Sequence, residues 1–338
     1  MNKDFKTMED IFDDIKCAKR LYDKGNFQEA YNIISDIIPT IDMMVETHMQ
    51  GENFGRKEYE AVYMLAGDIC GELGSNKEAL NNYFKHHFLQ FQINHDFQGK
   101  DSLKLFKFSS TRKYTLNNLS KNEITLVDPR VQNDIVDSPI FQWLDSPLFG
   151  RNARYKKHLD ALAASYNYLR ETSFCTDSED CRAVENTLMW AHYANSHKGI
   201  CVEYELDKKD FTSTYTLNAV VLRLLKVDYV NPRVKEEILD FTNNETSLNL
   251  RTALATKSID WQYENEVRMI AYVPNETSQY IQCYLDTINP IKAIYFGVQC
   301  PKQRENAVKK IFEHRPEVKF FKMKINPKNI HRLTFESC

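Results

Sequence analysis

The chain has little glycine and proline, no long apolar run and no concentration of charge of one sign. Only 10 of its 338 residues are glycine and 10 are proline, which argues against long low-complexity segments and many tight turns. The net charge of −3, without a conspicuous run of lysine or arginine, gives no clear nucleic-acid signal. No apolar run reaches the roughly 18 residues of a membrane span, and the N-terminus lacks the apolar centre of a secretory signal. The sequence therefore predicts a cytoplasmic protein without a membrane segment.

Familiar catalytic and metal-binding signatures are also missing. The chain has no glycine-rich phosphate loop, no His-Glu-x-x-His zinc helix and no Gly-x-Ser-x-Gly elbow. Its eight cysteines include no Cys-x-x-Cys pair. The nearest set of metal ligands is Cys175, Cys181, His192, His197 and Cys201. Their spacing misses the short cysteine knuckle of zinc sites, so we expect no metal and mostly reduced, buried cysteines.

What the chain does contain is typical of a folded protein with room for two domains. The chain is long enough to bury a substantial core, and its hydrophobic (42%) and charged (27%) fractions are ordinary for a globular protein. Aromatic residues are plentiful, with 18 tyrosines and 20 phenylalanines.

Residues 1–97 are expected to form a helical domain with a loose internal repeat. Residues 18–31 and 67–80 are similar, and in each a helix is expected to end at a glycine, Gly25 or Gly74. This pattern resembles tetratricopeptide units, which are stacked helical hairpins. The resemblance implies a groove for a protein or peptide partner, whereas a domain that only packs against the rest of the chain fits the pattern equally well.

From residue 98 to 338 the pattern changes to mixed helix and strand. We expect strands at 104–108, 123–127, 173–176, 200–206, 219–230, 266–273, 279–285, 291–296 and 318–324, the last one closing the sheet. We expect helices at 115–121, 152–170, around residue 190, at 233–257 and from 301 to about 313. This order predicts an α+β domain with a mixed, mostly antiparallel sheet.

Three signatures in this second domain resemble a known family. The first combines Ser-Phe-Cys at 173–175 with Leu-Met-Trp-Ala-His-Tyr-Ala at 188–194 and Gly-Ile-Cys-Val-Glu-Tyr at 199–204. The second is Lys-Ser-Ile-Asp-Trp-Gln-Tyr-Glu-Asn-Glu-Val-Arg at 257–268, and the third is Ile-Tyr-Phe-Gly at 294–297. Over about residues 103–315 the chain is similar to the bacterial domain of unknown function family 2971, whose function is not established.

The layout of that family is similar to ADP-ribosyltransferase-like folds, in which a split sheet forms a cleft for NAD. In those folds an early strand supplies a positioning residue, a helix supplies aromatic rings and a later strand supplies an essential glutamate. This likeness implies NAD or a related nucleotide as the substrate.

The chain departs from the family pattern at two places. The first strand usually continues Tyr-Arg, but here it reads Phe108-Ser109, so Arg112 is the nearest guanidinium. The usual Phe-Asn-Asp-Pro-Phe is replaced by the sequence at 132–136, where Asn133 and the following aspartate match. If the family's arginine binds a phosphate, this protein has either lost that ligand or supplied the charge from elsewhere.

The strand at 266–273 carries the candidate catalytic carboxylate. Side chains alternate along a strand, so Glu264, Glu266 and Arg268 share one face and lead into an apolar run. A carboxylate at the edge of a cleft would bind a ribose hydroxyl and stabilise an oxocarbenium-like transition state. A self-satisfied pair between Arg268 and a glutamate is the structural alternative.

Aromatic and basic residues nearby are candidates for binding the substrate, each with a structural alternative. Trp261 would stack on a base or anchor the core, and Lys257 would bind a phosphate or stabilise the C-terminus of its helix. On the helix around residue 190, His192 and Tyr193 would contact a ligand or be buried for structural reasons. His197 is expected to be structural, and Gly199 to adopt the left-handed conformation that ends this helix.

Two functions follow from these candidates. In an ADP-ribosyltransferase-like transferase or glycohydrolase, Glu266 would be the catalytic carboxylate, Arg268 would orient it, and Trp190, His192 and Tyr193 would line the cleft, while the helical domain recruits a target. In a non-enzymatic interaction or regulatory protein, these groups would be core and ion pairs. The first function requires Glu266 and Trp190 to line one concave site, whereas the second has them paired or buried.

Overall fold

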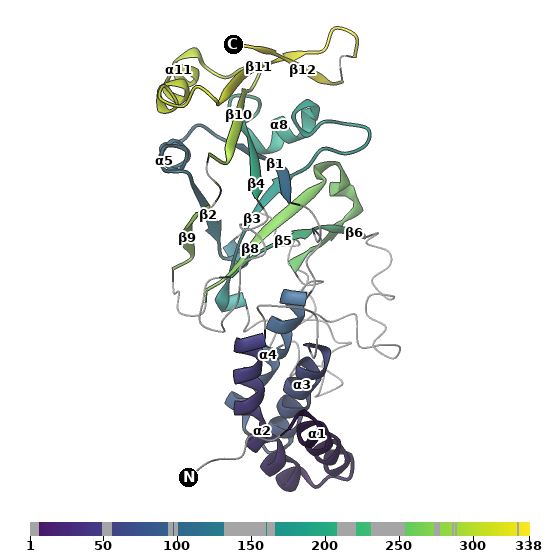
Figure 1. Ribbon diagram of the computed structural model, residues 1–338. Coiled ribbons are helices and arrows are strands. Elements are labelled where there is room, and N and C mark those ends of the chain that lie inside the picture. The colour runs from purple at the N-terminus through teal and green to yellow at the C-terminus, as the bar shows by residue number, and fades with distance from the viewer. Residues whose placement is uncertain are drawn as a thin grey trace.

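The structure is a computed structural model of the chain, and four helices followed by a large sheet make up most of its described part (Figure 1). It describes residues 7–48, 56–93, 97, 101–131, 160, 166–207, 221–230, 254–273, 278–285, 287, 289–329 and 331–338. The four helices gather at one end of the molecule, and the C-terminal strands and last helix lie at the other (Figure 1). The α+β fold predicted from the sequence is therefore confirmed.

The N-terminal helices form two hairpins. They are α1 (Met8–Asp23), α2 (Phe27–His48), α3 (Arg56–Glu72) and α4 (Asn76–Ile93). Helices α1 and α3 end within two residues of Gly25 and Gly74, as the sequence repeat indicated, and both glycines are left-handed (φ 79° and 76°). Both turns are closed by a backbone hydrogen bond between residues five positions apart. Asn26 N–H donates to Leu21 O in the first turn and Ser75 N–H donates to Cys70 O in the second, each at 2.9 Å.

The helices share an apolar cluster with the sheet. Buried residues of α2 and α3, such as Ile37 and Val62, belong to the same cluster as Leu169, Ile270 and Tyr272 of the sheet. Burial of such side chains is the main favourable contribution to folding. The hairpins therefore depend on the sheet for part of their core.

The strands form one ten-stranded sheet. They are β1 (Ser102–Ser109), β2 (Glu123–Val127), β3 (Leu169–Cys175), β4 (Ile200–Asp207), β5 (Val221–Lys226), β8 (Glu266–Tyr272), β9 (Tyr280–Tyr284), β10 (Ile291–Phe296), β11 (Lys319–Ile325) and β12 (Leu333–Ser337). The order is β12-β11-β10-β4-β1-β3-β2-β9, and β8 lies between β3 and β5. Only the β10–β11 pair is parallel among the described pairs of this sheet.

The sheet opens between β1 and β3. Strand β1 pairs with β4 along its whole length, and β3 pairs with β8 along its whole length. By contrast, β1 and β3 meet at the single pair Phe106–Cys175. Beyond this pair the two strands are no longer paired, so the sheet splits into two halves at this point.

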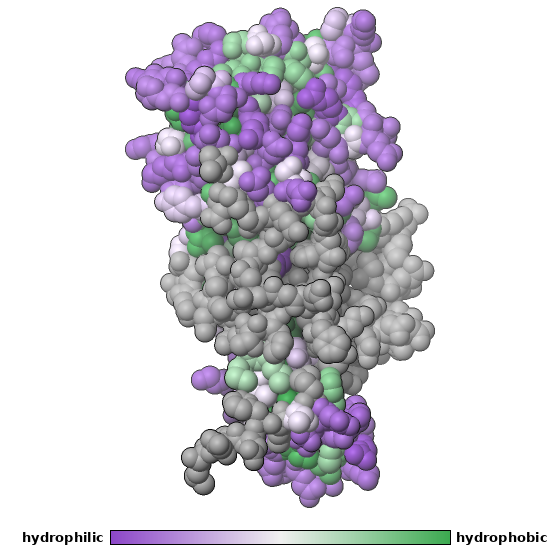
Figure 2. All heavy atoms as spheres, in the orientation of Figure 1, coloured by the Kyte–Doolittle hydropathy of each residue, from purple (hydrophilic) through white to green (hydrophobic). Residues whose placement is uncertain are grey.

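Short helices and a small second sheet complete the described part. The helices are α5 (Lys113–Lys121), α8 (Thr187–Tyr193) and α11 (Lys302–Ile311), with the 3₁₀ turns η1 (Pro129–Val131), η2 (Tyr166–Tyr168), η3 (Ala183–Glu185) and η6 (Ile259–Glu264). Strands β6 (Asp228–Val230) and β7 (Thr256–Ser258) pair in parallel. Hydrophilic residues cover most of the visible surface at the C-terminal end (Figure 2). Among the described helices, none has the length and apolar character needed to cross a bilayer.

Four predictions about elements are wrong in the described residues. The strand expected over 219–230 is interrupted at Val227, because β5 pairs with β8 in the large sheet and β6 pairs with β7 in the small one. The helix expected over 152–170 does not reach its C-terminus, because 166–168 form η2 and β3 starts at Leu169. The helix expected over 233–257 does not include Lys257, which lies in β7. The sheet does not close at β11, because β12 pairs along its outer side. Most of the two predicted helices lies outside the described residues, as do residues 219 and 220 of one predicted strand.

The turn between α8 and β4 differs from the expectation for Gly199. Gly199 is not left-handed; instead Asn195, Ser196 and His197 have φ values of 49°, 52° and 64°. Gly199 is required for a close approach, since a Cβ there would lie 2.2 Å from the Ser109 carbonyl oxygen at the end of β1.

Candidate functional site

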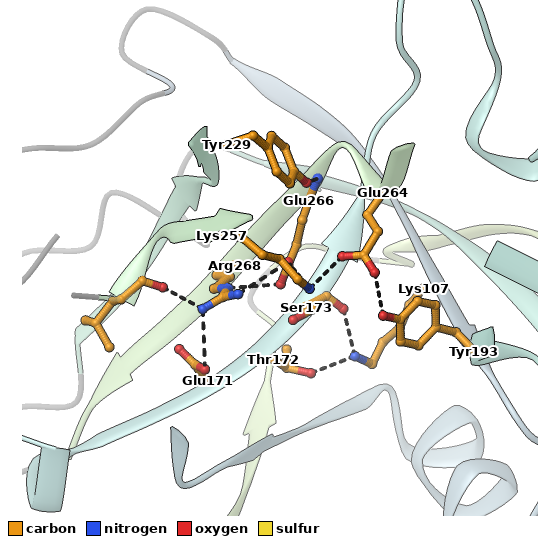
Figure 3. Close-up of polar contacts among 11 residues, drawn as sticks. Lys107, Glu171, Thr172, Ser173, Tyr193, Tyr229, Lys257, Glu264, Glu266 and Arg268 are labelled. Atoms are coloured by element: carbon orange, nitrogen blue, oxygen red, sulfur yellow. Dashed lines mark hydrogen bonds and ion pairs between the residues drawn. The ribbon is translucent and has the colours of Figure 1, made fainter. Parts of the chain in front are cut away.

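Four buried charged residues form a cluster at the start of β8 (Figure 3). Lys257 comes from β7, Glu264 from the end of η6, and Glu266 and Arg268 from β8. Their exposed fractions are 9%, 4%, 3% and 1%. Lys257 Nζ donates to Glu264 Oε2 at 2.7 Å and to Glu266 Oε2 at 3.2 Å, and Arg268 Nε donates to Glu266 Oε1 at 2.9 Å. One ammonium therefore bridges two carboxylates.

Asn265 brings the two carboxylates to the same lysine. Its backbone is left-handed (φ 43°), a conformation that asparagine tolerates better than most residues. Its side-chain amide donates to Thr176 Oγ1 at 2.8 Å and to Asp177 O at 2.9 Å. This bend places Glu264 and Glu266, on either side of Asn265, around Lys257.

Glu266 is held as an ionised anchor. Burial opposes its ionisation, but the charges of Arg268 and Lys257 and a hydrogen bond from Ser173 lower its pKa to about 2. Its backbone N–H donates to the Tyr229 hydroxyl at 2.8 Å. The self-satisfied ion pair considered from the sequence is therefore present between Glu266 and Arg268.

Glu264 links the buried cluster to the surface. The hydroxyl of Tyr193, in α8, donates to Glu264 Oε1, and 39% of Tyr193 is exposed. Burial raises the pKa of Glu264 above its usual value, although Lys257 and Tyr193 favour the ionised form. Burial and the bond to Glu264 also raise the pKa of Tyr193. Tyr193 therefore covers the carboxylate that lies closest to the rings of α8.

Aromatic rings surround the side chain of Tyr193. The His192 ring centroid lies 6.3 Å from those of Tyr193 and Trp261 and 6.4 Å from that of Tyr263, and Trp261 and Tyr263 are 6.0 Å apart. His192 is exposed, while Trp261 and Tyr263 are partly buried. Lys257 Nζ lies 5.1 Å from the Trp261 ring centroid, so this aromatic rim (His192, Tyr193, Trp261 and Tyr263) contacts the charged cluster.

Two predicted residues do not join this group. Trp190 is completely buried; its ring N–H donates to Val184 O at 2.8 Å, and it packs edge-on against Phe108 at 5.2 Å. Trp190 therefore has no exposed surface to line a cleft. Arg112 is exposed at the N-terminal cap of α5 and makes none of the contacts described for the cluster. Asn133 lies outside the described residues.

Sequence reasoning missed two contributors. Lys107 of β1 donates from Nζ to Thr172 Oγ1 at 2.6 Å and to Ser173 O at 3.0 Å, next to the residue that binds Glu266. The feature of the sequence that could have indicated Lys107 is the presence of a lysine within an otherwise apolar part of a strand. The contact between Glu264 and Tyr193 was missed because the two residues are 71 positions apart along the chain.

Within the described ranges, no three histidine, cysteine or acidic residues are grouped to hold a metal ion. Of the candidate zinc ligands, Cys175 and Cys201 are buried in one apolar cluster, whereas His192 is exposed.

Comparison with known proteins gives one partial match. Residues 189–269 match the sequence model of a family described as "Protein of unknown function (DUF2971)". No curated protein and no solved structure matches the chain. The matched segment contains the aromatic rim and the charged cluster, namely His192, Tyr193, Lys257, Trp261, Tyr263, Glu264, Glu266 and Arg268. The family resemblance is therefore supported over the part of the chain that carries the candidate site.

Proposed function

We propose that this protein binds NAD or a related nucleotide and breaks its glycosidic bond, as a transferase or glycohydrolase of the ADP-ribosyltransferase type. The observation that carries the proposal is the position of Glu264, a buried carboxylate held by Lys257 and covered by the hydroxyl of the exposed Tyr193. The separation of β1 from β3 agrees with the split sheet that forms the nucleotide cleft in such folds.

The two carboxylates have different functions in this proposal. Glu266 is already bound by Arg268, Lys257 and Ser173, so it positions Lys257. Glu264 is the catalytic residue, because a ribose hydroxyl replaces the Tyr193 hydroxyl as its hydrogen-bond donor once the ligand moves Tyr193 aside. The rings of His192 and Trp261 stack on the heteroaromatic part of the ligand.

The reaction follows from a carboxylate next to the anomeric carbon. The bond between that carbon and the nicotinamide nitrogen breaks, and the electron pair leaves with nicotinamide, which becomes neutral. Positive charge develops on the sugar ring, and the ionised carboxylate stabilises it. Water or a nucleophile on a target then bonds to the anomeric carbon and releases its proton to solvent. Helices α1–α4 would recruit such a target.

The test compares two buried glutamates. Glu264→Gln removes the proposed catalytic charge, and Glu305→Gln is the matched control, because Glu305 is also 4% exposed and also binds a lysine closely, Lys322 at 2.6 Å. Release of nicotinamide and gain of ADP-ribose mass on proteins are measured with NAD. The proposal predicts that wild type and the control are active while Glu264→Gln is folded and at least about a hundredfold slower.

A non-enzymatic interaction protein is the second candidate. The complete burial of Trp190 and the pairing of Glu266 with Arg268 and Lys257 favour it. In this case the aromatic rim is a contact surface for a partner, and neither wild type nor any variant releases nicotinamide. Both glutamate variants would then differ from wild type in stability alone.

A further inference from the structure

Lys107 lies at the point where the sheet opens. It follows Phe106, the residue at which β1 and β3 are paired, and its side chain reaches toward Thr172 and Ser173 on β3. Figure 3 shows its amine beside Thr172 and Ser173, with Ser173 next to the charged cluster. The side chain of Lys107 therefore bridges the two halves of the sheet.

The ammonium of Lys107 is held by neutral groups. Its hydrogen-bond acceptors are a hydroxyl and a carbonyl, and the Phe174 ring centroid is 5.1 Å away. Of the carboxylates in the described residues, none lies within ion-pair distance of it. Lys104 on the same strand differs, because its side chain is exposed and its Nζ lies 3.5 Å from Glu203 Oε1.

An anion would stabilise such a group further. Partial burial of an ammonium without a counter-charge opposes folding, and this burial lowers the pKa of Lys107 to about 8 although Cys175 and Glu266 act in the opposite direction. Two of the three ammonium protons are used by Thr172 and Ser173, so one donor remains. The Thr172 hydroxyl supplies a second polar group next to it.

We propose that Lys107 binds a phosphate group of the ligand, at the point where β1 and β3 cease to pair. This inference rests on the proposed function for the location of the ligand and adds its charged part. A phosphate fits better than a neutral group, because it supplies the missing negative charge and several acceptor oxygens to one ammonium. The first strand of this chain lacks the arginine of the family pattern. In this proposal Lys107, rather than Arg112, supplies the positive charge in its place.

Calorimetric titration of the full chain with ADP, inorganic pyrophosphate and adenosine tests the phosphate site without any chemical step. Lys107→Met is expected to weaken ADP and pyrophosphate binding by about tenfold to a hundredfold and to leave adenosine binding unchanged. The matched control Lys104→Met, on the same strand, should bind all three like wild type. Equal binding of ADP by wild type and Lys107→Met, or no binding of either phosphate compound by wild type, overturns the inference.

Acylation of lysine amines, measured by mass spectrometry, tests the wild-type chain. It therefore tests the phosphate site even when Lys107→Met does not fold. Saturating pyrophosphate should protect Lys107 from acylation and leave Lys104 unchanged. Labelling of Lys107 that pyrophosphate does not alter, or no labelling in its absence, contradicts a reachable anion site. If ADP binding depends on Lys107 while NAD is not consumed, the phosphate site stands and the proposed reaction fails.

Discussion

At the scale of single residues, Glu264 and Glu266 are two positions apart, but their pKa values are shifted in opposite directions. Burial alone would raise the pKa of both. For Glu266 the charges of Arg268 and Lys257 outweigh burial and lower its pKa to about 2, whereas burial prevails at Glu264 and raises its pKa. Glu266 is fixed as an anchor, and Glu264 is the carboxylate whose environment the ligand would change in the proposed function.

Glu266→Gln is expected to destabilise the protein by about 3 kcal/mol, because Arg268 and Lys257 lose the carboxylate that they share and keep only Glu171 and Glu264 as buried counter-charges. Urea unfolding followed by circular dichroism measures this loss. Glu305→Gln should lower the free energy of unfolding by less. The side chains of its partners Lys302 and Lys322 are 74% and 23% exposed, so water can solvate them. Equal losses in the two variants would contradict a tightly coupled cluster.

The same residue predicts a pH dependence. The folded pKa of Glu266, about 2, lies below its usual value of 4.5, so the unfolded chain binds the proton more readily. This contribution to stability is complete above pH 4.5 and is lost as the pH falls toward 2. The stability advantage of wild type over Glu266→Gln should therefore shrink between neutral pH and about pH 3 in urea titrations. A difference that does not change with pH would be inconsistent with an ionised anchor.

At the scale of elements, the turn between α8 and β4 joins the parts of the site. Three consecutive residues, Asn195 to His197, are left-handed, which costs L-residues about 1–2 kcal/mol each. His197 N–H bonds to Trp190 O at 3.0 Å, and a Cβ at Gly297 would lie 2.2 Å from His197 O. Contacts with α8 and with the loop after β10 therefore hold the turn and, with it, the position of Tyr193.

Ser196→Gly is expected to stabilise the protein by about 0.5–1 kcal/mol, because glycine adopts the left-handed conformation without strain. The matched control is Ser120→Gly in α5, where glycine should lower stability by about 0.5 kcal/mol. Thermal unfolding of the two variants measures both effects. A destabilised Ser196→Gly would mean that the turn is not strained at this position.

The sequence predicted those strands whose buried residues are apolar, and it missed the part of a strand in which charged residues are buried. Strands β4 and β10 were found from their apolar pattern, whereas the start of β3 was missed because Arg170 and Glu171 are buried beside Leu169 and break that pattern. Alternation along β8 indicated the pairing of Glu266 with Arg268. The contact of Tyr193 with Glu264 depends on how α8 packs on η6, which periodicity along the chain does not report.

At the scale of the whole molecule, the hairpins and the sheet are joined by one apolar cluster. Because residues of α2 and α3 pack in the same cluster as Leu169, Leu225 and Ile270, separating the parts would expose these side chains to water. We therefore expect one cooperative unfolding transition. Differential scanning calorimetry measures this, and two separate transitions would show that the helices fold as an independent unit.

The proposed reaction depends on Glu264, and nicotinamide release from NAD tests that dependence most directly. With the full chain at neutral pH, wild type should release nicotinamide, Glu305→Gln should do so at a similar rate, and Glu264→Gln should be folded but slower by at least about a hundredfold. Equal release by wild type and a folded Glu264→Gln, or no release by wild type, would contradict a catalytic function for the carboxylate beneath Tyr193.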